Sequence, residues 1–342
     1  MVQLALLFAL FKQIKPLPPV LQAVLTDKTV IVTGANTGLG FEAAKHFARM
    51  NPGKLILACR NEDKGKQAVQ KLMHDTGYAK AEVWLLDLNN FASVVGFADK
   101  FGTEGGGRLD ILVENAAVAP VGAYQKTADG YMTTFQVNAL APPLHTFLLL
   151  PHMIRTAQEH PETNPRIVFV SSGLYQVSKL PTEVGRKITE QPNFIEALNS
   201  LDYFNNTSTD DHYSDSKLLN ILFARALQSR LSVSCPSIVV NSVDPGYCVS
   251  ELRRSISGPR AWFLSLMDLL VAYSTEEGSR NLVHAALVGS KATIGASENE
   301  AKFKGVYLST QKITNFSSFV RSEAGMKLQE NFWVRLDGFV HS

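Results

Sequence analysis

The chain of 342 residues contains only three cysteines, at positions 59, 235 and 248. They are odd in number and widely separated, so the sequence predicts neither a disulfide framework nor a cysteine-based metal site. We therefore expect no metal ion. Free cysteines favour a reducing compartment, and we expect a cytoplasmic protein.

An excess of one charge is also missing. The 33 lysine and arginine residues nearly balance the 31 aspartate and glutamate residues, which leaves a net charge of +2. Proteins that bind nucleic acid usually carry a clustered basic face, so we expect no such partner. The hydrophobic fraction of 45% is enough for a sizeable core in one large α/β domain or two small ones.

The apolar run at the N-terminus, residues 1–11 (MVQLALLFALF), is short. As a helix it would rise about 16 Å, and it cannot span a hydrocarbon core of about 30 Å. Lys12 and Lys15 follow the run, whereas a secretory signal carries its positive charges first. Residues 1–27 are predicted to form an apolar leader. It either caps the domain as a short helix or lies on a membrane surface as a peripheral contact.

Seven apolar, β-rich segments alternate with helical patterns along the rest of the chain. Fully apolar strands separated by helices predict a parallel sheet covered on both faces, in a single domain over residues 28–342. The predicted strands are 29–32, 55–59, 82–86, 111–113, 167–171, 238–243 and 306–309, and helices are expected to start near residues 38, 62, 91, 131, 213 and 276.

Residues 173–212 show little periodicity of either kind and include a polar stretch at 205–211. Long irregular segments in compact domains are usually functional lids or disordered. We expect a loop insertion here.

A glycine-rich turn, residues 33–40 (TGANTGLG), follows the first strand and opens the first helix. Glycines allow a tight turn and a close approach of the backbone to a pyrophosphate, and the helix N-terminus offers unpaired N–H groups. The spacing is Gly-x-x-x-Gly-x-Gly instead of the standard Gly-x-Gly-x-x-Gly. The segment predicts a dinucleotide site.

Tyr213 and Lys217 are four residues apart and share one face of a predicted helix. An ammonium group near a phenol lowers the phenol's pKa, so such a tyrosine can exchange a proton with an alcohol or ketone. Tyr175 and Lys179 have the same spacing but lie in the irregular segment. We therefore assign the chemistry to Tyr213 and expect Tyr175 to be a loop or pocket residue.

Over about residues 28–310 the chain resembles the short-chain dehydrogenase/reductase family. Glu114 and Ala117 depart from that family's Asn-Asn-Ala-Gly signature after the fourth strand. The gap between Ser172 and Tyr213 resembles the retinol-dehydrogenase and protochlorophyllide-reductase branch. The leader and the tail at 322–329 resemble fungal members of that branch. The matching motifs are the turn at 33–40, Asn115-Ala116, Val170-Ser171-Ser172, Tyr213-x-x-Ser216-Lys217 and Pro245-Gly246.

This resemblance implies a Rossmann-type doubly wound sheet of about seven strands and assigns roles to residues. Tyr213 is implied to exchange the proton, Lys217 to lower its pKa and hold the nicotinamide ribose, and Ser172 to bind the substrate oxygen. Asn138 is implied to hold a relay water through its main chain. The implied cofactor-binding residues are Gly34, Asn36, Thr37, Gly38, Leu39, Gly40, Asp87, Asn115, Ala116, Tyr213, Lys217, Pro245, Gly246 and Ser250.

The second strand ends at Cys59-Arg60 without a carboxylate. An acidic residue there would bind a ribose 2′-hydroxyl and repel a 2′-phosphate, whereas a guanidinium suits a phosphate. Arg60 therefore predicts NADP(H) as the cofactor.

Residues 250–273 are rich in apolar side chains, and in the resembled family this stretch is a mobile lid over the substrate. An apolar lid favours a bulky apolar alcohol or ketone. The same residues could instead pack on the domain or on a second subunit of a homo-oligomer. A C-terminal helix follows near the end of the chain.

Pro142 and Pro143 lie inside the helix expected from Tyr131 to about Gln158. Proline has no N–H to donate to the carbonyl four residues back, so the pair leaves the carbonyl of Asn138 without its usual partner. We hypothesise either that this carbonyl binds the relay water or that the kink only fits the helix to the sheet.

The sequence thus predicts an NADP-dependent oxidoreductase that interconverts a carbonyl and an alcohol, with a role in secondary metabolism by analogy only. Two alternatives stay open: a dinucleotide sensor or scaffold without catalysis, and a C=C reductase of the protochlorophyllide type.

Overall fold

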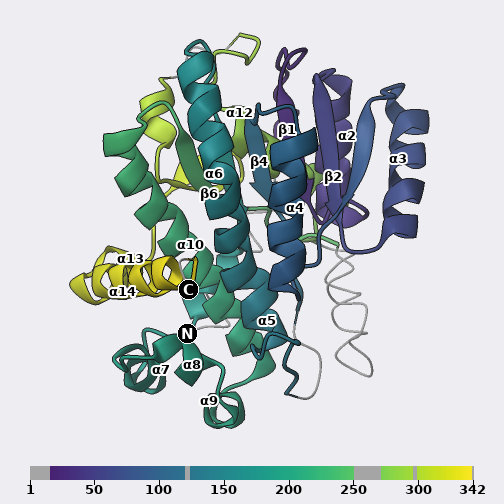
Figure 1. Cartoon of the computed structure of the whole chain (residues 1–342). Helices are drawn as coiled ribbons and strands as arrows, with labels where there is room; N and C mark the ends of the chain where they lie inside the picture. Colours follow the sequence, from purple (N-terminus) through teal and green to yellow (C-terminus); the bar gives the residue numbers. More distant parts are fainter. Residues whose placement is uncertain (1–15, 120–123, 250–270, 296–298, 341–342) are drawn as a thin grey trace.

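The computed structural model describes residues 16–119, 124–249, 271–295 and 299–340. One sheet runs through the molecule in the order β3-β2-β1-β4-β5-β6-β7-β8 (Figure 1). The strands are β1 (Thr29–Thr33), β2 (Lys54–Cys59), β3 (Ala81–Leu85), β4 (Ile111–Glu114), β5 (Arg166–Val170), β6 (Val239–Asp244), β7 (Tyr307–Ser309) and β8 (Lys312–Thr314).

The first seven strands are parallel, which confirms the predicted doubly wound sheet. β8 was not predicted. It is only three residues long and pairs antiparallel with β7 after a tight turn in which Thr310 and Gln311 have positive φ. Such a short edge strand carries no periodic signal in the sequence.

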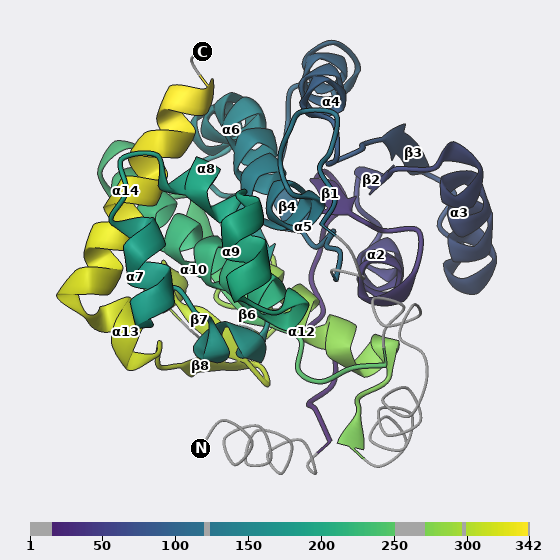
Figure 2. The ribbon, with the colours of Figure 1, turned by 90° about the horizontal axis from the view of Figure 1, so that it is seen from below.

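Helices cover both faces of the sheet, with α2 and α12 on one side and α4 and α6 on the other (Figure 2). α3 also packs with the first group, and α10 and α14 with the second. The long helices are α2 (Gly38–Arg49), α3 (Glu62–Thr76), α4 (Phe91–Glu104), α6 (Ala141–Glu159), α10 (Thr209–Ser234), α12 (Thr275–Leu287) and α14 (Glu323–Val340), with the short α13 (Ser318–Arg321) before the last.

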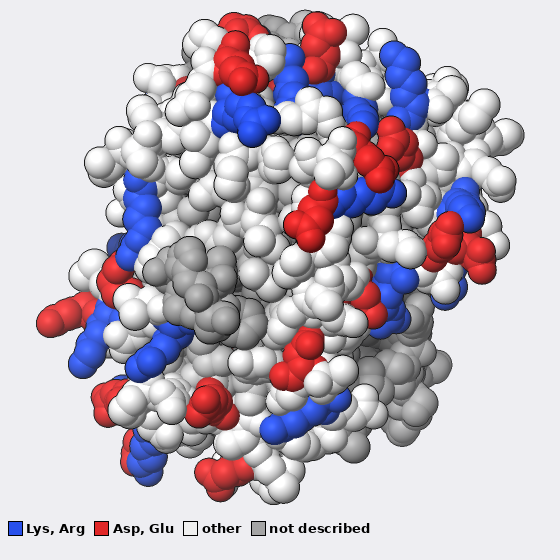
Figure 3. Space-filling model, in the orientation of Figure 1, with Lys and Arg blue, Asp and Glu red and all other residues white. Residues whose placement is uncertain are grey.

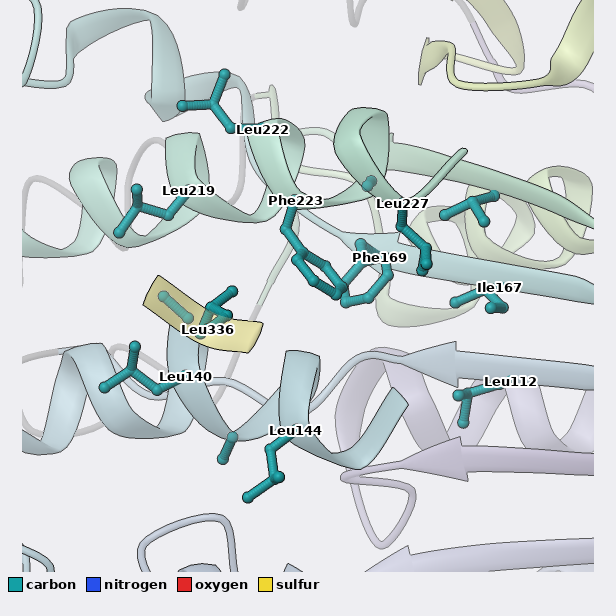
Figure 4. Close-up of a cluster of buried hydrophobic side chains, with 14 of the residues drawn as sticks. Leu112, Leu140, Leu144, Ile167, Phe169, Leu219, Leu222, Phe223, Leu227 and Leu336 are labelled. Carbon is teal, nitrogen blue, oxygen red and sulfur yellow. The ribbon is translucent and has the colours of Figure 1, made fainter. Parts of the chain in front are cut away.

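Alternation along the strands divides the core between the two faces. In β1, Val30 and Val32 point toward α2 and α12, while Ile31 points to the opposite layer. In that opposite layer, Phe169 of β5 meets Phe223 of α10 at 5.3 Å, edge to face, among buried leucines (Figure 4). Each fully buried side chain of this size contributes about 1.5–3 kcal/mol to folding.

Residues 173–212 are not the irregular loop that the sequence predicted. They form a 3-10 turn (Gly173–Val177) and three short helices, α7 (Glu183–Thr189), α8 (Phe194–Leu198) and α9 (Leu201–Asn206). Helices of five to seven residues are too short to show a 3.6-residue period. The polar stretch before Tyr213 is explained by a capping box of Ser208 and Asp211, which starts α10 at Thr209.

The helix expected from Tyr131 is irregular, as the proline pair predicted. α5 (Thr133–Phe135) is followed by a π-helical segment (Gln136–Leu140) and then by α6. The carbonyl of Asn138 would pair with the N–H of residue 142 in an α-helix or of residue 143 in a π-helix. Both residues are proline, so neither pattern supplies a donor.

Part of the predicted leader belongs to the domain. Leu25 is fully buried, and the N–H of Val24 donates to the carbonyl of Ala292 at 2.9 Å. Residues 1–15 and most of the predicted lid, residues 250–270, lie outside the described residues. Among those that are described, no helix is long and apolar enough to cross a membrane. On the face shown in Figure 3, basic and acidic side chains are interspersed.

Candidate active site

A cavity of about 1240 Å³ opens at the carboxyl ends of the parallel strands. β1 and β4 are neighbours there, and the chain leaves them toward opposite sides, which is where doubly wound folds bind ligands. The volume exceeds the roughly 300–1,000 Å³ of an ordinary small-ligand site, so the cavity has room for two ligands side by side. The predicted site residues in its wall are Gly34, Asn36, Thr37, Gly38, Leu39, Arg60, Asp87, Asn115, Ala116, Tyr213, Lys217 and Pro245.

Three of the remaining predicted residues, Gly40, Gly246 and Ser172, lie near the cavity without lining it, and Ser250 is outside the described residues. Gly40 has a packing role. A Cβ atom there would come within 2.4 Å of the Asn115 amide and 2.6 Å of the Gly34 carbonyl oxygen. Gly34 and Gly38 have φ values of +65° and +60°, which favour glycine.

Buried polar groups hold the turn and the end of β4 together. Thr33 Oγ1 accepts hydrogen bonds from the N–H groups of Asn115 and Ala116 at 2.9 and 3.0 Å. The departure at Glu114 is accommodated by a histidine on α6. Glu114 Oε1 lies 2.7 Å from Nδ1 of the fully buried His145, and Oε2 lies 3.3 Å from Thr33 Oγ1. Sequence reasoning missed His145 because it lies 31 residues from Glu114.

Tyr213 and Lys217 project from adjacent turns of α10 into the cavity wall. Lys217 Nζ lies 5.5 Å from the centre of the Tyr213 ring and donates to the carbonyl of Val170 at 2.8 Å. The spacing therefore brings the pair together as predicted.

The pKa of Tyr213 differs from the expectation. Burial raises the pKa of this phenol well above its usual value, the charge of Asp244 raises it further, and a hydrogen bond with Ser172 opposes both effects. Burial also lowers the pKa of Lys217 to about 7. The expected lowering of the Tyr213 pKa is therefore wrong for this structure, because removing both groups from water disfavours their charged forms.

The two serines after β5 face different ways. Ser171 is buried, and its hydroxyl donates to the Lys217 carbonyl at 2.9 Å, so it points into the structure as predicted. Ser172 is partly exposed. Its Oγ accepts from the N–H of Leu174 at 3.2 Å and also bonds to Tyr213, so the capping role and the site contact coexist.

Asn138 is buried behind the cavity, and its side-chain amide is fully engaged. Its Oδ1 accepts from the N–H of Val118 at 2.9 Å, and its Nδ2 donates to the Val118 carbonyl and to Ser216 Oγ at 3.1 Å. The side chain thus joins the loop after β4 to α10. Its main-chain carbonyl is the group that lacks a helical donor.

The second tyrosine–lysine pair is not part of the site. Tyr175 lies in the 3-10 turn with 2% of its surface exposed, and its hydroxyl accepts from the N–H of Ser317 at 3.0 Å. Its ring packs edge to face on Tyr307. Because it lies in this turn and does not line the cavity, the structure supports the first of the two expectations, a loop residue, and not the second, a pocket residue.

The structure adds residues that the sequence did not single out. Lys64, Gln67 and Lys71 share one face of α3 and line the cavity beyond Arg60. Their i, i+3, i+7 spacing shows in the sequence that they share a helix face, but it does not show that this face points to the cavity. At the other end the wall includes Gln125, Thr133, Thr134 and Phe204. No group of three or more potential metal ligands occurs among the described residues.

Residues 28–181 match the short chain dehydrogenase family. The chain is 34% identical over 313 residues to a short chain dehydrogenase/reductase of Cryptosporiopsis sp., dmxR8, covering 91% of this chain and 90% of that protein. The chain belongs to the short chain dehydrogenase family. Another fungal member, the short-chain dehydrogenase anuD of Penicillium roqueforti, is 34% identical over 337 residues and covers 96% of this chain and 81% of its own.

Solved structures show the same fold. A putative uncharacterized protein from Mycobacterium paratuberculosis superposes with a TM-score of 0.66 at 24% identity, covering 94% of this chain and 96% of its own. Salutaridine reductase from Papaver somniferum has a TM-score of 0.59 at 22% identity, and the match covers 82% of this chain and 99% of that protein. NADPH-bound carbonyl reductase from chicken fatty liver has a TM-score of 0.59 at 19% identity, and the match covers 86% of this chain and 96% of that protein. These confirm the Rossmann-type fold of this dehydrogenase.

Proposed function

We propose that this short chain dehydrogenase uses NADP(H) to interconvert a carbonyl and a primary or secondary alcohol on an apolar small molecule. The observation that carries the proposal is the convergence of Tyr213, Lys217 and Ser172 at one end of a long cavity. Basic side chains occupy the other end. Its relatives are fungal, and a role in secondary metabolism is part of the proposal.

The cavity fits a dinucleotide. The left-handed glycines Gly34 and Gly38 and the N-terminus of α2 provide backbone donors for a pyrophosphate. Asn115 and Pro245 line the path from this turn toward Tyr213. When bound, the nicotinamide group supplies or accepts the hydride, and the protein supplies orientation and electrostatics.

The proton is handled by Tyr213. A phenol whose pKa is raised by burial stays protonated at neutral pH and can give its proton to a carbonyl oxygen as that oxygen gains charge. Ser172, which is hydrogen-bonded to the Tyr213 hydroxyl, would also bind the substrate's carbonyl oxygen and hold it in place. Lys217 places its Nζ beside the Tyr213 ring and links that tyrosine to the proton supply through the Asn138 carbonyl and a water.

We propose that the choice between NADP(H) and NAD(H) is made at the end of the cavity away from Tyr213. Arg60 and Lys64 line the cavity with exposed side chains just after the end of β2, and Lys71, paired with Asp75 at 3.3 Å, lies two turns farther along α3. The two cations nearest the strand end favour a ribose 2′-phosphate, and a guanidinium can bind it with two hydrogen bonds. Asp87, held by Asn89, is proposed to contact the adenine.

The test is oxidation of NADPH, and separately of NADH, with a panel of apolar ketones, and the reverse reaction with the matching alcohols. The expected result is turnover of at least one ketone that depends on Tyr213 and prefers NADPH. Tight cofactor binding without turnover of any ketone or alcohol would contradict the enzyme and favour the sensor alternative. Reduction of a C=C bond alone would favour the second alternative.

A further inference from the structure

One aromatic side chain of the insertion reaches the cavity. Among the described residues between Gly173 and Thr207, only Phe204 of α9 lines it. Its ring centre lies 5.1 Å from that of His212, which directly precedes Tyr213. Phe204 therefore stands at the proton-transfer end of the cavity, far along the wall from Arg60.

The ring of Phe204 is held by neighbours that leave part of it exposed. Tyr124 meets it edge to face at 5.3 Å, and His212 lies tilted against it. The ring is partly buried, and it lines the cavity. Around it the wall is mainly apolar, with a few polar groups, and the residues are Val118, Ala119, Met132 and Val137 with Gln125 and Thr133. Such a wall suits a flat aromatic ligand with polar substituents.

α9 is fastened to the helix that carries Tyr213 and Lys217. The hydroxyl of the buried Tyr203 donates to the carboxylate of Asp215, which lies between those two residues on α10. The same carboxylate accepts from Ser178 Oγ at 2.6 Å and from the N–H of Lys179 at 2.7 Å. Asp215 has no exposed surface. A single buried group thus ties α9, the residues after the 3-10 turn and α10 together.

A second tie holds the insertion to the opposite wall. Asn199, between α8 and α9, accepts from the N–H of Met132 through Oδ1 at 2.7 Å. Its carbonyl accepts from the Tyr124 hydroxyl at 2.5 Å. In the view from below, α8 and α9 lie over α10 (Figure 2). The position of Phe204 is therefore fixed relative to Tyr213 from both sides.

We propose that Phe204 contacts the substrate and selects aromatic ketones or alcohols over saturated ones, and that Tyr203 and Asp215 are positioning residues for it. The inference rests on the proposed carbonyl–alcohol function and names the substrate class of that site. An aromatic ring beside Phe204 gains an offset or edge-to-face contact that a saturated ring cannot make.

The test compares 2-acetylnaphthalene with its saturated counterpart 2-acetyldecalin, with NADPH as reductant. The unaltered protein is expected to have the higher kcat/KM on the aromatic ketone. Phe204→Leu keeps an apolar wall but loses the ring. It should raise KM for 2-acetylnaphthalene by about three- to tenfold, with kcat and the NADPH dissociation constant nearly unchanged. Leu201→Ala, at an exposed position of the same helix, is the matched control and should leave KM and kcat for both ketones unchanged.

Tyr203→Phe removes only the hydroxyl that binds Asp215. As a positioning change it should raise KM for the aromatic ketone in the same direction as Phe204→Leu, while NADPH affinity and kcat stay near those of the unaltered protein. A variant that loses kcat on both ketones together with NADPH affinity would overturn the positioning role and show a general structural one.

Equal KM changes on the two ketones in Phe204→Leu would overturn the aromatic contact. Turnover of other ketones with neither probe accepted would overturn the substrate class while leaving the proposed function intact. Cofactor binding without turnover of any ketone or alcohol would instead defeat the proposed function itself.

Discussion

At the scale of single residues, the two tyrosine–lysine pairs show that spacing does not decide chemistry. Tyr213 lines the cavity beside Lys217. Tyr175 instead accepts a hydrogen bond from Ser317 and packs its ring on Tyr307 in the core. What separates the two tyrosines is their position: Tyr213 lines the cavity and Tyr175 does not.

Tyr213→Phe should lower kcat by at least a hundredfold, because general acid–base catalysis contributes about 10²–10⁴ in rate. The NADPH dissociation constant, measured by cofactor fluorescence, should change only a few-fold since the ring still packs. The control Tyr175→Phe should retain most activity and lose about 1 kcal/mol of unfolding free energy with its hydrogen bond. The opposite pattern, an inactive Tyr175→Phe and an active Tyr213→Phe, would show that the wrong pair was assigned.

Arg60→Ala should weaken NADPH binding about ten- to a hundredfold and NADH binding far less, because a charge-assisted contact is worth roughly 1.5–3 kcal/mol. Lys66→Ala is the matched control. Lys66 lies on α3, which begins just after Arg60; it pairs with Glu62 at 2.7 Å and does not line the cavity. Fluorescence titration with both cofactors measures the effect. Equal affinity of the unaltered protein for NADPH and NADH would refute the assignment of Arg60.

At the scale of elements, the π-helical segment lies just before two adjacent prolines of α6, which have no N–H to donate to the preceding turn. It buries Asn138, whose amide bonds to Val118 and Ser216, and leaves its carbonyl without a helical donor. Segments of this kind are frequent at functional sites. Here it lies directly behind Lys217's helix.

Pro142→Ala tests whether the free carbonyl matters. The variant restores an N–H that can bond the Asn138 carbonyl, so its thermal midpoint should equal or exceed that of the unaltered protein. If the carbonyl holds the relay water, kcat should fall several-fold, most at the pH where proton supply limits turnover. Pro151→Ala, farther along α6, serves as the control for removing a proline from this helix. A stable Pro142→Ala protein with unchanged kcat at every pH would leave the kink a purely structural role.

At the scale of the whole molecule, stability is coupled to the carboxylate that ties the insertion to α10. Burial raises the pKa of Asp215 from 3.8 to about 6 despite its hydrogen bonds to Ser178, Tyr203 and Lys179. A raised folded-state pKa means that the folded protein takes up this proton before the unfolded chain does. Its contribution to stability is therefore greatest below about pH 4 and is lost as the pH rises through 6.

The unaltered protein should gain about 1 kcal/mol of unfolding free energy relative to Asp215→Asn when the pH is lowered from 7 to 5. Denaturant titrations of both proteins at the two pH values give this difference. His212 and His284, whose pKa values are lowered by burial to about 4, oppose the trend equally in both proteins and cancel. A parallel pH response of the two proteins would show that Asp215 titrates normally.

Much of the site was predictable because its signals are local. The glycine spacing at 33–40, the four-residue separation of Tyr213 and Lys217, and the apolar strands each lie within one stretch of chain. α9 and β8 were not predictable, since six and three residues are too few for a period to appear. Glu114 read as a departure from the family signature, and only His145 from α6 explains how it is buried.

Local patterns were enough to predict the seven parallel strands, the longer helices between them, the glycine-rich turn and the Tyr213–Lys217 spacing, because backbone geometry and side-chain period act between near neighbours. The tertiary structure alone decided which tyrosine meets the cavity, that Lys64 and Lys71 face it beside Arg60, and that Phe204 stands next to Tyr213's end of it. It also decided the pKa values of Tyr213, Lys217 and Asp215. The reason is physical: burial and contact depend on residues brought together from distant parts of the chain, and no local pattern records them.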